Sequence, residues 1–246
     1  MVTPPLPPPP DEPAATPPGV QIVLLRPRWA SNLGSVARAM KNFGLARLTI
    51  VDSRIGSWAD AWRMAVQARD VLETARQGVT LDEALADATW VVGTTNEPPP
   101  GTRVLTPREV AHEVGRHQRA ALLFGGEIDG LAPAELLRCH AVAVIPTAPS
   151  QSSLNLAQAV CVFAAELFAA RMATVPPPAG GPPLATAALL QHLERHLRTL
   201  LAGSAWADAD RGKHAIAELL QPLWRAQLTD DEARAWLVAL SKAAQR

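Results

Sequence analysis

Short apolar runs alternate with amphipathic stretches from residue 20 to about residue 173. Five of these runs are β-branched or leucine-rich: Gln21 to Leu25, Arg47 to Val51, Thr89 to Gly93, Ala121 to Gly125 and Ala141 to Ile145. Near-continuous apolar runs of this kind are typical of parallel strands that are buried on both faces. The pattern therefore predicts an α/β fold in which helices cover both faces of a parallel sheet.

Helix signals lie between the predicted strands. After the first run, apolar residues recur at helical spacing at Leu33, Val36, Met40 and Phe43. Ser31 and Asn32 are expected to cap the start of this helix, and Gly44 is expected to end it. Farther along, Thr80 and Glu83 have the spacing of a capping box and predict the start of a second, short helix.

Proline content marks the limits of this α/β core. Residues 1 to 18 contain nine prolines, which remove backbone donors and fix φ, so residues 1–19 are expected to form a disordered leader. The core is then expected to span residues 20–173. Five prolines and two glycines lie between Pro176 and Pro183, and residues 174–183 are therefore interpreted as a linker.

The residues after the linker, 184–246, predict a small α-helical domain, which is interpreted as an accessory, RNA-binding domain. Three helical patterns occur there, over residues 184–201, around 214–224 and over 230–244. The first has an apolar stripe that includes Leu189, Leu193, Leu197 and Leu200. Because the segment has an apolar face of its own, we expect it to fold separately from the core.

Charge and composition narrow the function. The formal net charge is zero, but residues 21 to 80 hold nine Lys or Arg against four acids, while residues 81 to 173 hold six against ten. A basic first half suits a polyanion such as RNA, although a solvated surface explains a modest excess equally well.

No apolar run approaches the length of a membrane span, and no secretory signal pattern occurs, so a cytoplasmic protein without a membrane segment is expected. Cys139 and Cys161 match neither a redox pair nor a zinc site and are interpreted as small core residues.

Three loops rich in small residues follow predicted strands. They are Gly93 to Asn96, Gly125 to Gly130, and Ile145 to Thr147 leading to Ser152 to Asn155. Ligands of open α/β sheets bind outside the carboxyl ends of the strands, so these loops mark a candidate pocket. The phosphate-loop, GxGxxG and GxSxG patterns are absent, which disfavours nucleotidases, dinucleotide-binding enzymes and simple hydrolases. His192 and His196 lack the HExxH order, and no metal is expected.

Taken together, three segments resemble the signatures of the SPOUT-class (TrmH/SpoU) RNA ribose 2′-O-methyltransferases. They are Asn32 to Leu45, Phe124 to Leu131, and Ile145–Pro146 followed by Ser153 to Val160. They occur in the family's order and spacing. The sequence of the third segment and the helical extension after the linker are most similar to the TrmJ branch. The resemblance implies an α/β knotted core with a trefoil knot, S-adenosylmethionine as the methyl donor, a homodimer, and methylation of cytidine or uridine at position 32 of the transfer-RNA anticodon loop.

The resemblance also assigns residues to the site. Arg38 and Asn32 match catalytic positions, with Arg38 expected to clamp a nucleotide phosphate because a guanidinium stays protonated at pH 7. The expected cofactor contacts are Thr94, Thr95, Asn96, Gly125, Ile145, Ser152, Ser153 and Leu154. The expected substrate contacts are Arg26, Lys41, Glu127 and Asn155.

The chain departs from the TrmJ pattern at three places. Gly126 replaces an arginine, Ser150 and Gln151 replace an acidic-aromatic pair, and Pro98 to Pro100 replace an arginine-bearing loop. These departures leave two alternatives open. One is the same chemistry on another nucleotide of transfer or ribosomal RNA, and the other is a catalytically weak RNA-binding assembly factor.

Overall fold

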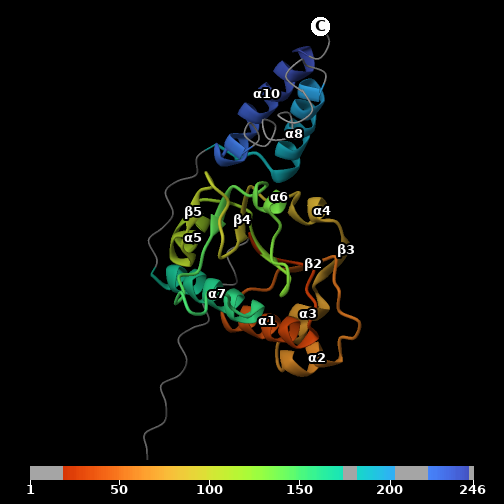
Figure 1. Ribbon diagram of the computed structural model, residues 1–246, viewed down its shortest axis with the longest axis vertical. Coiled ribbons are helices and arrows are strands. Elements are labelled where there is room, and N and C mark those ends of the chain that lie inside the picture. The colour runs from red at the N-terminus through yellow and green to blue at the C-terminus, as the bar shows by residue number, and fades with distance from the viewer. Residues whose placement is uncertain (1–18, 174–181, 203–220, 244–246) are drawn as a thin grey trace, which may run out of the picture.

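The fold is built on one seven-stranded sheet, as the computed structural model describes it for residues 19–173, 182–202 and 221–243 (Figure 1). The strands are β1 (Val20–Leu25), β2 (Leu48–Val51), β3 (Arg76–Val79), β4 (Trp90–Thr94), β5 (Val104–Leu105), β6 (Ala120–Gly125) and β7 (Ala141–Ala143). They lie in the order β3-β2-β1-β6-β4-β7-β5, and each neighbouring pair is parallel. The predicted α/β class is therefore confirmed.

Helices cover both faces of the sheet. The first face carries α1 (Ala30–Asn42), α2 (Ala59–Ala65), α3 (Arg69–Glu73), α5 (Pro107–Val114) and α7 (Leu156–Met172). The second face carries α4 (Leu81–Leu85), α6 (Pro133–Leu136) and α8 (Ala187–Ala202), with α10 (Asp230–Ala243) packed along α8. In Figure 1, α1, α2, α3 and α7 lie below the sheet, whereas α4, α6, α8 and α10 lie above it.

Alternating side chains in the central strands supply both hydrophobic cores. In β1, Ile22 and Leu24 join the cluster of the first face, while Val23 and Leu25 join the cluster of the second. Successive side chains of a strand point to opposite faces, so a strand between two helical layers must be apolar at every position. This requirement explains why the central strands read as continuous apolar runs.

All five predicted strands are present, with boundaries that differ by at most two residues. Two further strands, β3 and β5, were not predicted, because β3 has only one apolar residue and β5 is too short to give a pattern. They form the two edges of the sheet; β3 is largely exposed, and β5 has only two residues. An edge strand is not sandwiched between helical layers, so its sequence need not be apolar.

The predicted start of α1 is wrong. The N-cap residue is Trp29, which makes no side-chain capping bond, and Ser31 and Asn32 lie within the helix. The carboxylate of Glu127, from a distant loop, accepts the backbone N–H groups of Arg28 and Trp29 instead. The predicted end is confirmed, because Gly44 follows the C-cap in a left-handed conformation (φ +69°).

The capping box predicted at Thr80 and Glu83 is also present. The Thr80 side chain accepts the N–H of Glu83, and the Glu83 carboxylate accepts the N–H of Thr80. The helix that it opens, α4, ends at Leu85. A capping box depends only on residues three apart, which makes it visible in the sequence.

The helical tail shares a core with the sheet, contrary to the separate folding that its apolar stripe suggested. Trp224 and Leu190 are buried in one cluster with Val91 of β4 and Leu123 of β6. The N–H of Ala187 also donates to the carbonyl of Ala88, next to the sheet. The predicted helix around 214–224 is described only from residue 221, and the leader and most of the linker lie outside the described residues.

Candidate active site

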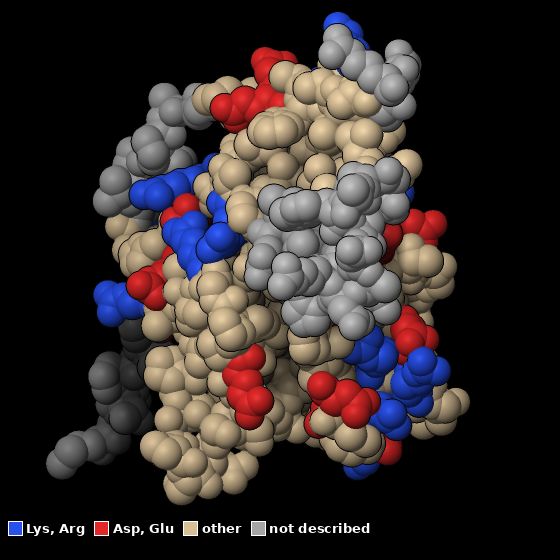
Figure 2. Space-filling model, turned by 45° about the horizontal axis from the view of Figure 1, so that its top comes forward, with Lys and Arg blue, Asp and Glu red and all other residues tan. Residues whose placement is uncertain are grey.

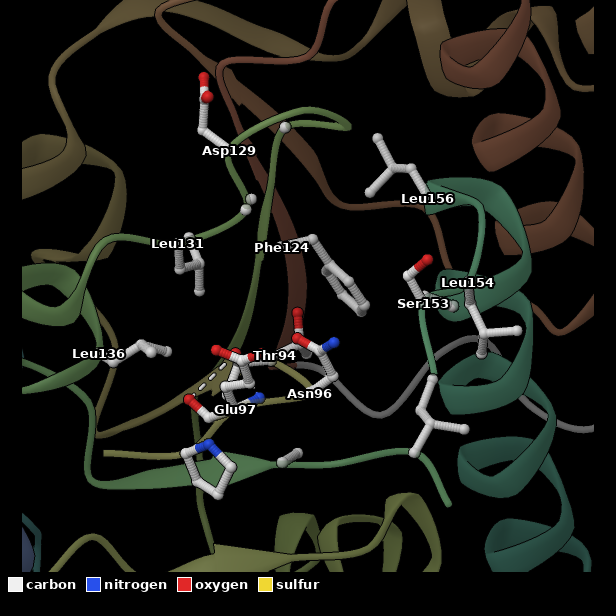
Figure 3. A pocket seen from close by; sticks show the side chains of 18 of the residues that line it. Thr94, Asn96, Glu97, Phe124, Asp129, Leu131, Leu136, Ser153, Leu154 and Leu156 are labelled. Carbon is white, nitrogen blue, oxygen red and sulfur yellow. Dashed lines mark hydrogen bonds between the residues drawn. The ribbon is translucent and has the colours of Figure 1, made fainter. Parts of the chain in front are cut away.

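Three loops meet at the carboxyl edge of β6, β4 and β7, which are neighbours in the sheet. Together they enclose a cavity of about 760 Å³, within the range usual for small-molecule sites (Figure 3). The cavity is lined by every residue predicted to contact a cofactor: Thr94, Thr95, Asn96, Gly125, Ile145, Ser152, Ser153 and Leu154. Residues from three distant parts of the sequence are thus brought to one place.

The walls of the cavity differ in chemistry. Figure 3 shows Phe124 between Leu131 and Leu136 on one side and Leu154 on the other. The polar lining comes from hydroxyl and amide side chains of the first and third loops and from the carboxylates of Glu97, Glu127 and Asp129. Among the described residues that line the cavity, none is Lys or Arg. A ligand with an apolar ring system and a positive charge fits this lining.

A chain of polar side chains links the three signature segments beside the cavity. Asn32 donates from Nδ2 to Glu127 Oε1 at 2.9 Å and accepts at Oδ1 from Asn155 Nδ2 at 2.8 Å. Asn155 also caps α7, because its Oδ1 accepts the N–H of Ala157 at 2.9 Å. Asn32, Glu127 and Asn155 therefore hold α1, the β6 loop and α7 in a fixed arrangement.

The three cations predicted for the site lie outside the cavity lining. Arg38 is exposed on α1, and within the described part of the chain no ion pair to it is found. Lys41 forms an exposed ion pair with Asp70 at 2.8 Å. Arg26 lies behind the cavity wall, where its guanidinium bonds Glu135.

Several residues that line the cavity were not among the predicted cofactor contacts. Phe124 and Leu131 lie in a signature segment but read as ordinary core residues. Leu136 reaches the cavity because α6 packs on β4, a tertiary contact that no local pattern reports. Pro98 to Pro100, one of the departures from the TrmJ pattern, also lines the cavity. This departure therefore changes the cavity wall directly.

Several basic residues of the first half are paired with carboxylates in the structure. Arg28, Lys41, Arg54 and Arg63 each lie within ion-pair distance of an aspartate. On the face seen in Figure 2, basic and acidic side chains are interspersed. A contact with a polyanion must therefore come from particular residues and not from a broad field of one sign.

The structure offers neither a metal site nor a membrane span in the part that it describes. No group of three or more His, Cys, Asp or Glu side chains is close enough together there to hold a metal ion. His192 and His196 pack edge to face, with ring centroids 4.7 Å apart. Within the same residues, no helix combines the length and apolarity that crossing a bilayer requires.

Comparison with known proteins places this cavity in context. The model of the SpoU rRNA Methylase family matches residues 19–165. The tRNA (cytidine/uridine-2′-O-)-methyltransferase TrmJ of Klebsiella pneumoniae is 42% identical over 161 residues, which span 63% of this chain and 65% of that protein. The tRNA (cytidine/uridine/adenosine-2′-O-)-methyltransferase TrmJ of Pseudomonas aeruginosa is 33% identical over 85% of this chain and 88% of its own length. The crystal structure of TrmJ from Zymomonas mobilis (Z. mobilis ZM4) matches with a TM-score of 0.80 and 30% identity, covering 91% of this chain and 98% of that one.

Proposed function

The chain belongs to the SpoU rRNA methylase family, and we propose that it methylates a ribose 2′-hydroxyl of transfer RNA, at position 32 of the anticodon loop. The methyl donor is S-adenosylmethionine. One observation carries the proposal: the three strand-end loops line a single cavity beside the polar chain of Asn32, Glu127 and Asn155. The relatives named as transfer-RNA methyltransferases support the choice of transfer RNA.

The residues of the cavity fit this methyl donor, which supplies a cationic sulfonium whose methyl group an oxygen nucleophile attacks. Apolar side chains such as Phe124, Leu131 and Leu136 suit an adenine ring, and the carboxylates of Glu97, Glu127 and Asp129 suit a positive charge. Loops on the carboxyl edge of a rigid sheet hold both reactants in fixed positions, which lowers the entropic part of the barrier.

Arg38 is proposed to act on the acceptor side. Its exposure on α1, outside the cavity lining, leaves the guanidinium free to bind a phosphate of the RNA. A bound phosphate orients the ribose hydroxyl, and the fixed positive charge stabilises the oxyanion that develops as its proton leaves. Asn32 is proposed to support this end of α1 through its bonds to Glu127 and Asn155.

The test is methyl transfer to transfer RNA by the wild type and by Arg38→Ala, followed by mass spectrometry of the digested RNA to identify the nucleotide. We expect Arg38→Ala to lose at least about 100-fold in rate, as removal of a transition-state donor does, with donor affinity unchanged within a few fold. Arg116→Ala is the control, because Arg116 is an exposed arginine outside both the cavity lining and the tail, paired with Glu113, and this variant should retain the wild-type rate. A wild type that binds the donor but leaves the RNA unmethylated would favour the assembly-factor alternative.

A homodimer is part of the proposal. The support comes from α7, which bears an apolar stripe on its partly exposed side: Cys161, Val162, Ala165, Ala169 and Met172. Apart from Gln158 and Glu166, the residues on this side are apolar, and an apolar helix face is normally buried. Light scattering at micromolar concentration should give twice the chain mass, and Val162→Glu should shift it towards the monomer.

The trefoil knot and the cytoplasmic location are also proposed. The position of β7 supports the knot, because this late strand is inserted between β4 and β5, which both precede it in the chain. The relatives' transfer-RNA substrates support the location. A fluorescent fusion that concentrated at the cell envelope would contradict it.

A further inference from the structure

Arg26 makes a fork of hydrogen bonds behind one wall of the cavity. Its Nη1 donates to Glu135 Oε1 at 2.5 Å, and its Nη2 donates to Glu135 Oε2 at 2.9 Å and to the carbonyl oxygen of Gly130 at 3.2 Å. The Arg26 and Glu135 side chains are only 25% and 18% exposed. A paired, bidentate guanidinium with little exposure is strongly oriented.

The wall that Arg26 holds makes up a large part of the cavity. Eight lining residues come from it: Gly126, Glu127, Ile128, Asp129, Gly130, Leu131, Pro133 and Leu136. The fork bonds the wall near its middle, at Gly130, and near its end, at Glu135 on α6. Arg26 itself does not line the cavity, so it can affect a ligand there only through the wall.

The backbone of Arg26 meets the start of the same wall. Arg26 directly follows β1 and has a left-handed conformation (φ +58°), which is uncommon for a residue other than glycine. A Cβ atom on Gly126 would lie 2.3 Å from the carbonyl oxygen of Arg26, so no side chain fits at position 126 while this carbonyl stays in place. The left-handed turn and Gly126 are therefore coupled, and Arg26 meets the wall at three points: through hydrogen bonds to Gly130 and Glu135 and through the close approach of its carbonyl oxygen to Gly126.

Glu135 is ionised, which strengthens its hydrogen bonds from Arg26. Burial alone would raise the pKa of this carboxyl, but hydrogen bonds from Arg26 and from the N–H of Ala132 lower it. Glu135 therefore stays ionised at neutral pH and holds the guanidinium in the wall. The sequence had suggested that Arg26 contacts RNA, yet the fork uses both of its terminal nitrogens.

We propose that Arg26 is a positioning residue for the methyl-donor site, which anchors the wall from Gly126 to Leu136 and thereby sets the affinity for S-adenosylmethionine. This inference rests on the proposed function. It assigns Glu135 as the anchor of the fork. It also assigns Gly126 as the position that must stay without a side chain.

The experiment measures S-adenosylmethionine binding by calorimetry on the full chain, and the KM for transfer RNA at saturating donor. Arg26→Gln and Glu135→Gln should each raise the Kd for the donor at least tenfold. The Kd of the double variant should not exceed that of the single variant with the higher Kd, because both substitutions break the same Arg26–Glu135 pair. Arg26→Lys keeps the charge but loses the fork, and we expect an intermediate, several-fold loss. Arg28→Gln is the matched control, since the side chain of Arg28 makes only a long ion pair with Asp129, at 3.8 Å, among the described residues. The Kd of this variant should stay within twofold of the wild type.

The possible outcomes separate the inference from the proposed function. A wild type that binds no donor would contradict the proposed function itself. A wild type that binds, with Arg26→Gln and Arg26→Lys binding equally well, would overturn the positioning role. An unchanged Kd with a raised KM for RNA would also overturn it and would place Arg26 in the acceptor site. Thermal melting of each variant shows whether it is folded, and Arg26→Lys serves as the test if Arg26→Gln is not.

Discussion

The two faces of the sheet are covered in different ways. The first face is covered by helices that precede residue 173, including the 13-residue α1 and the 17-residue α7. On the second face, the same part of the chain supplies only α4 and α6, of five and four residues. The rest of that cover comes from the tail, through residues such as Leu190 and Trp224. The tail is therefore part of the core of the methyltransferase domain as well as an extension of it.

Removal of residues 174–246 gives the largest expected effect. Without the tail, Val91, Leu123 and Val142 lose part of their cover, and exposed apolar area destabilises by roughly 25 cal/mol per Å². We expect the shortened chain to lose the cooperative thermal transition of the full chain, measured by circular dichroism and by dye binding to exposed apolar surface. If the shortened chain unfolds in a sharp thermal transition within a few degrees of the wild type, the first face and the sheet are stable without the tail.

A single tryptophan tests the same difference on a smaller scale. Trp224 is 1% exposed and packs edge to face on His140, with centroids 5.3 Å apart, while Trp236 of α10 is 52% exposed. Trp224→Ala should cost about 3–5 kcal/mol of unfolding free energy, as loss of a buried aromatic does. Trp236→Ala is the control and should cost less than about 0.5 kcal/mol. Urea denaturation of both variants gives the comparison, and similar midpoints would contradict the role of the tail.

The sequence predicts the first face and the strand-end loops better than the second face. Continuous apolar runs reveal β1, β4 and β6, because each is sandwiched between helices. The sequence also predicts the apolar stripe of the tail, but it does not show what the tail packs against. No local pattern shows that Trp224 contacts the sheet. Likewise, Asn32, Glu127 and Asn155 were each predicted as site residues, whereas the hydrogen bonds that join them depend on the folded loops.

Each face also holds one neutral, buried histidine. Burial lowers the pKa of His140, on the second face, to about 3, and that of His117, which stacks on Trp90 of the first, to about 4. As the pH falls below about 6.5, the unfolded chain binds protons that the folded protein does not. The free energy of unfolding should therefore fall by up to about 1.4 kcal/mol per pH unit for each histidine.

Urea denaturation at pH 7.5 and pH 5 measures this effect. His140→Asn keeps an acceptor for the N–H of Val91, and His117→Phe keeps a ring on Trp90 while removing two nitrogens without hydrogen-bond partners in the described structure. Each variant should reduce the change in the free energy of unfolding between pH 7.5 and pH 5 by about half. If neither variant alters the slope, the two histidines do not carry the pH dependence.

Thiol labelling compares the opening of the two faces directly. Cys139, on the second face, is buried, and burial raises the pKa of its thiol to about 12, while Cys161 lies half-buried on α7. The thiolate is the reactive form, so in the monomeric variant Val162→Glu, which leaves α7 uncovered, a maleimide or disulfide reagent at pH 7.5 should modify Cys161 first and Cys139 only when the second face opens. Trp224→Ala removes part of the cover of that face and should speed labelling of Cys139 selectively, by a factor that matches its loss of stability. Peptide mass spectrometry resolves the two sites. Equal acceleration at both cysteines would mean that the faces open together, and that the tail stabilises the domain as one cooperative unit.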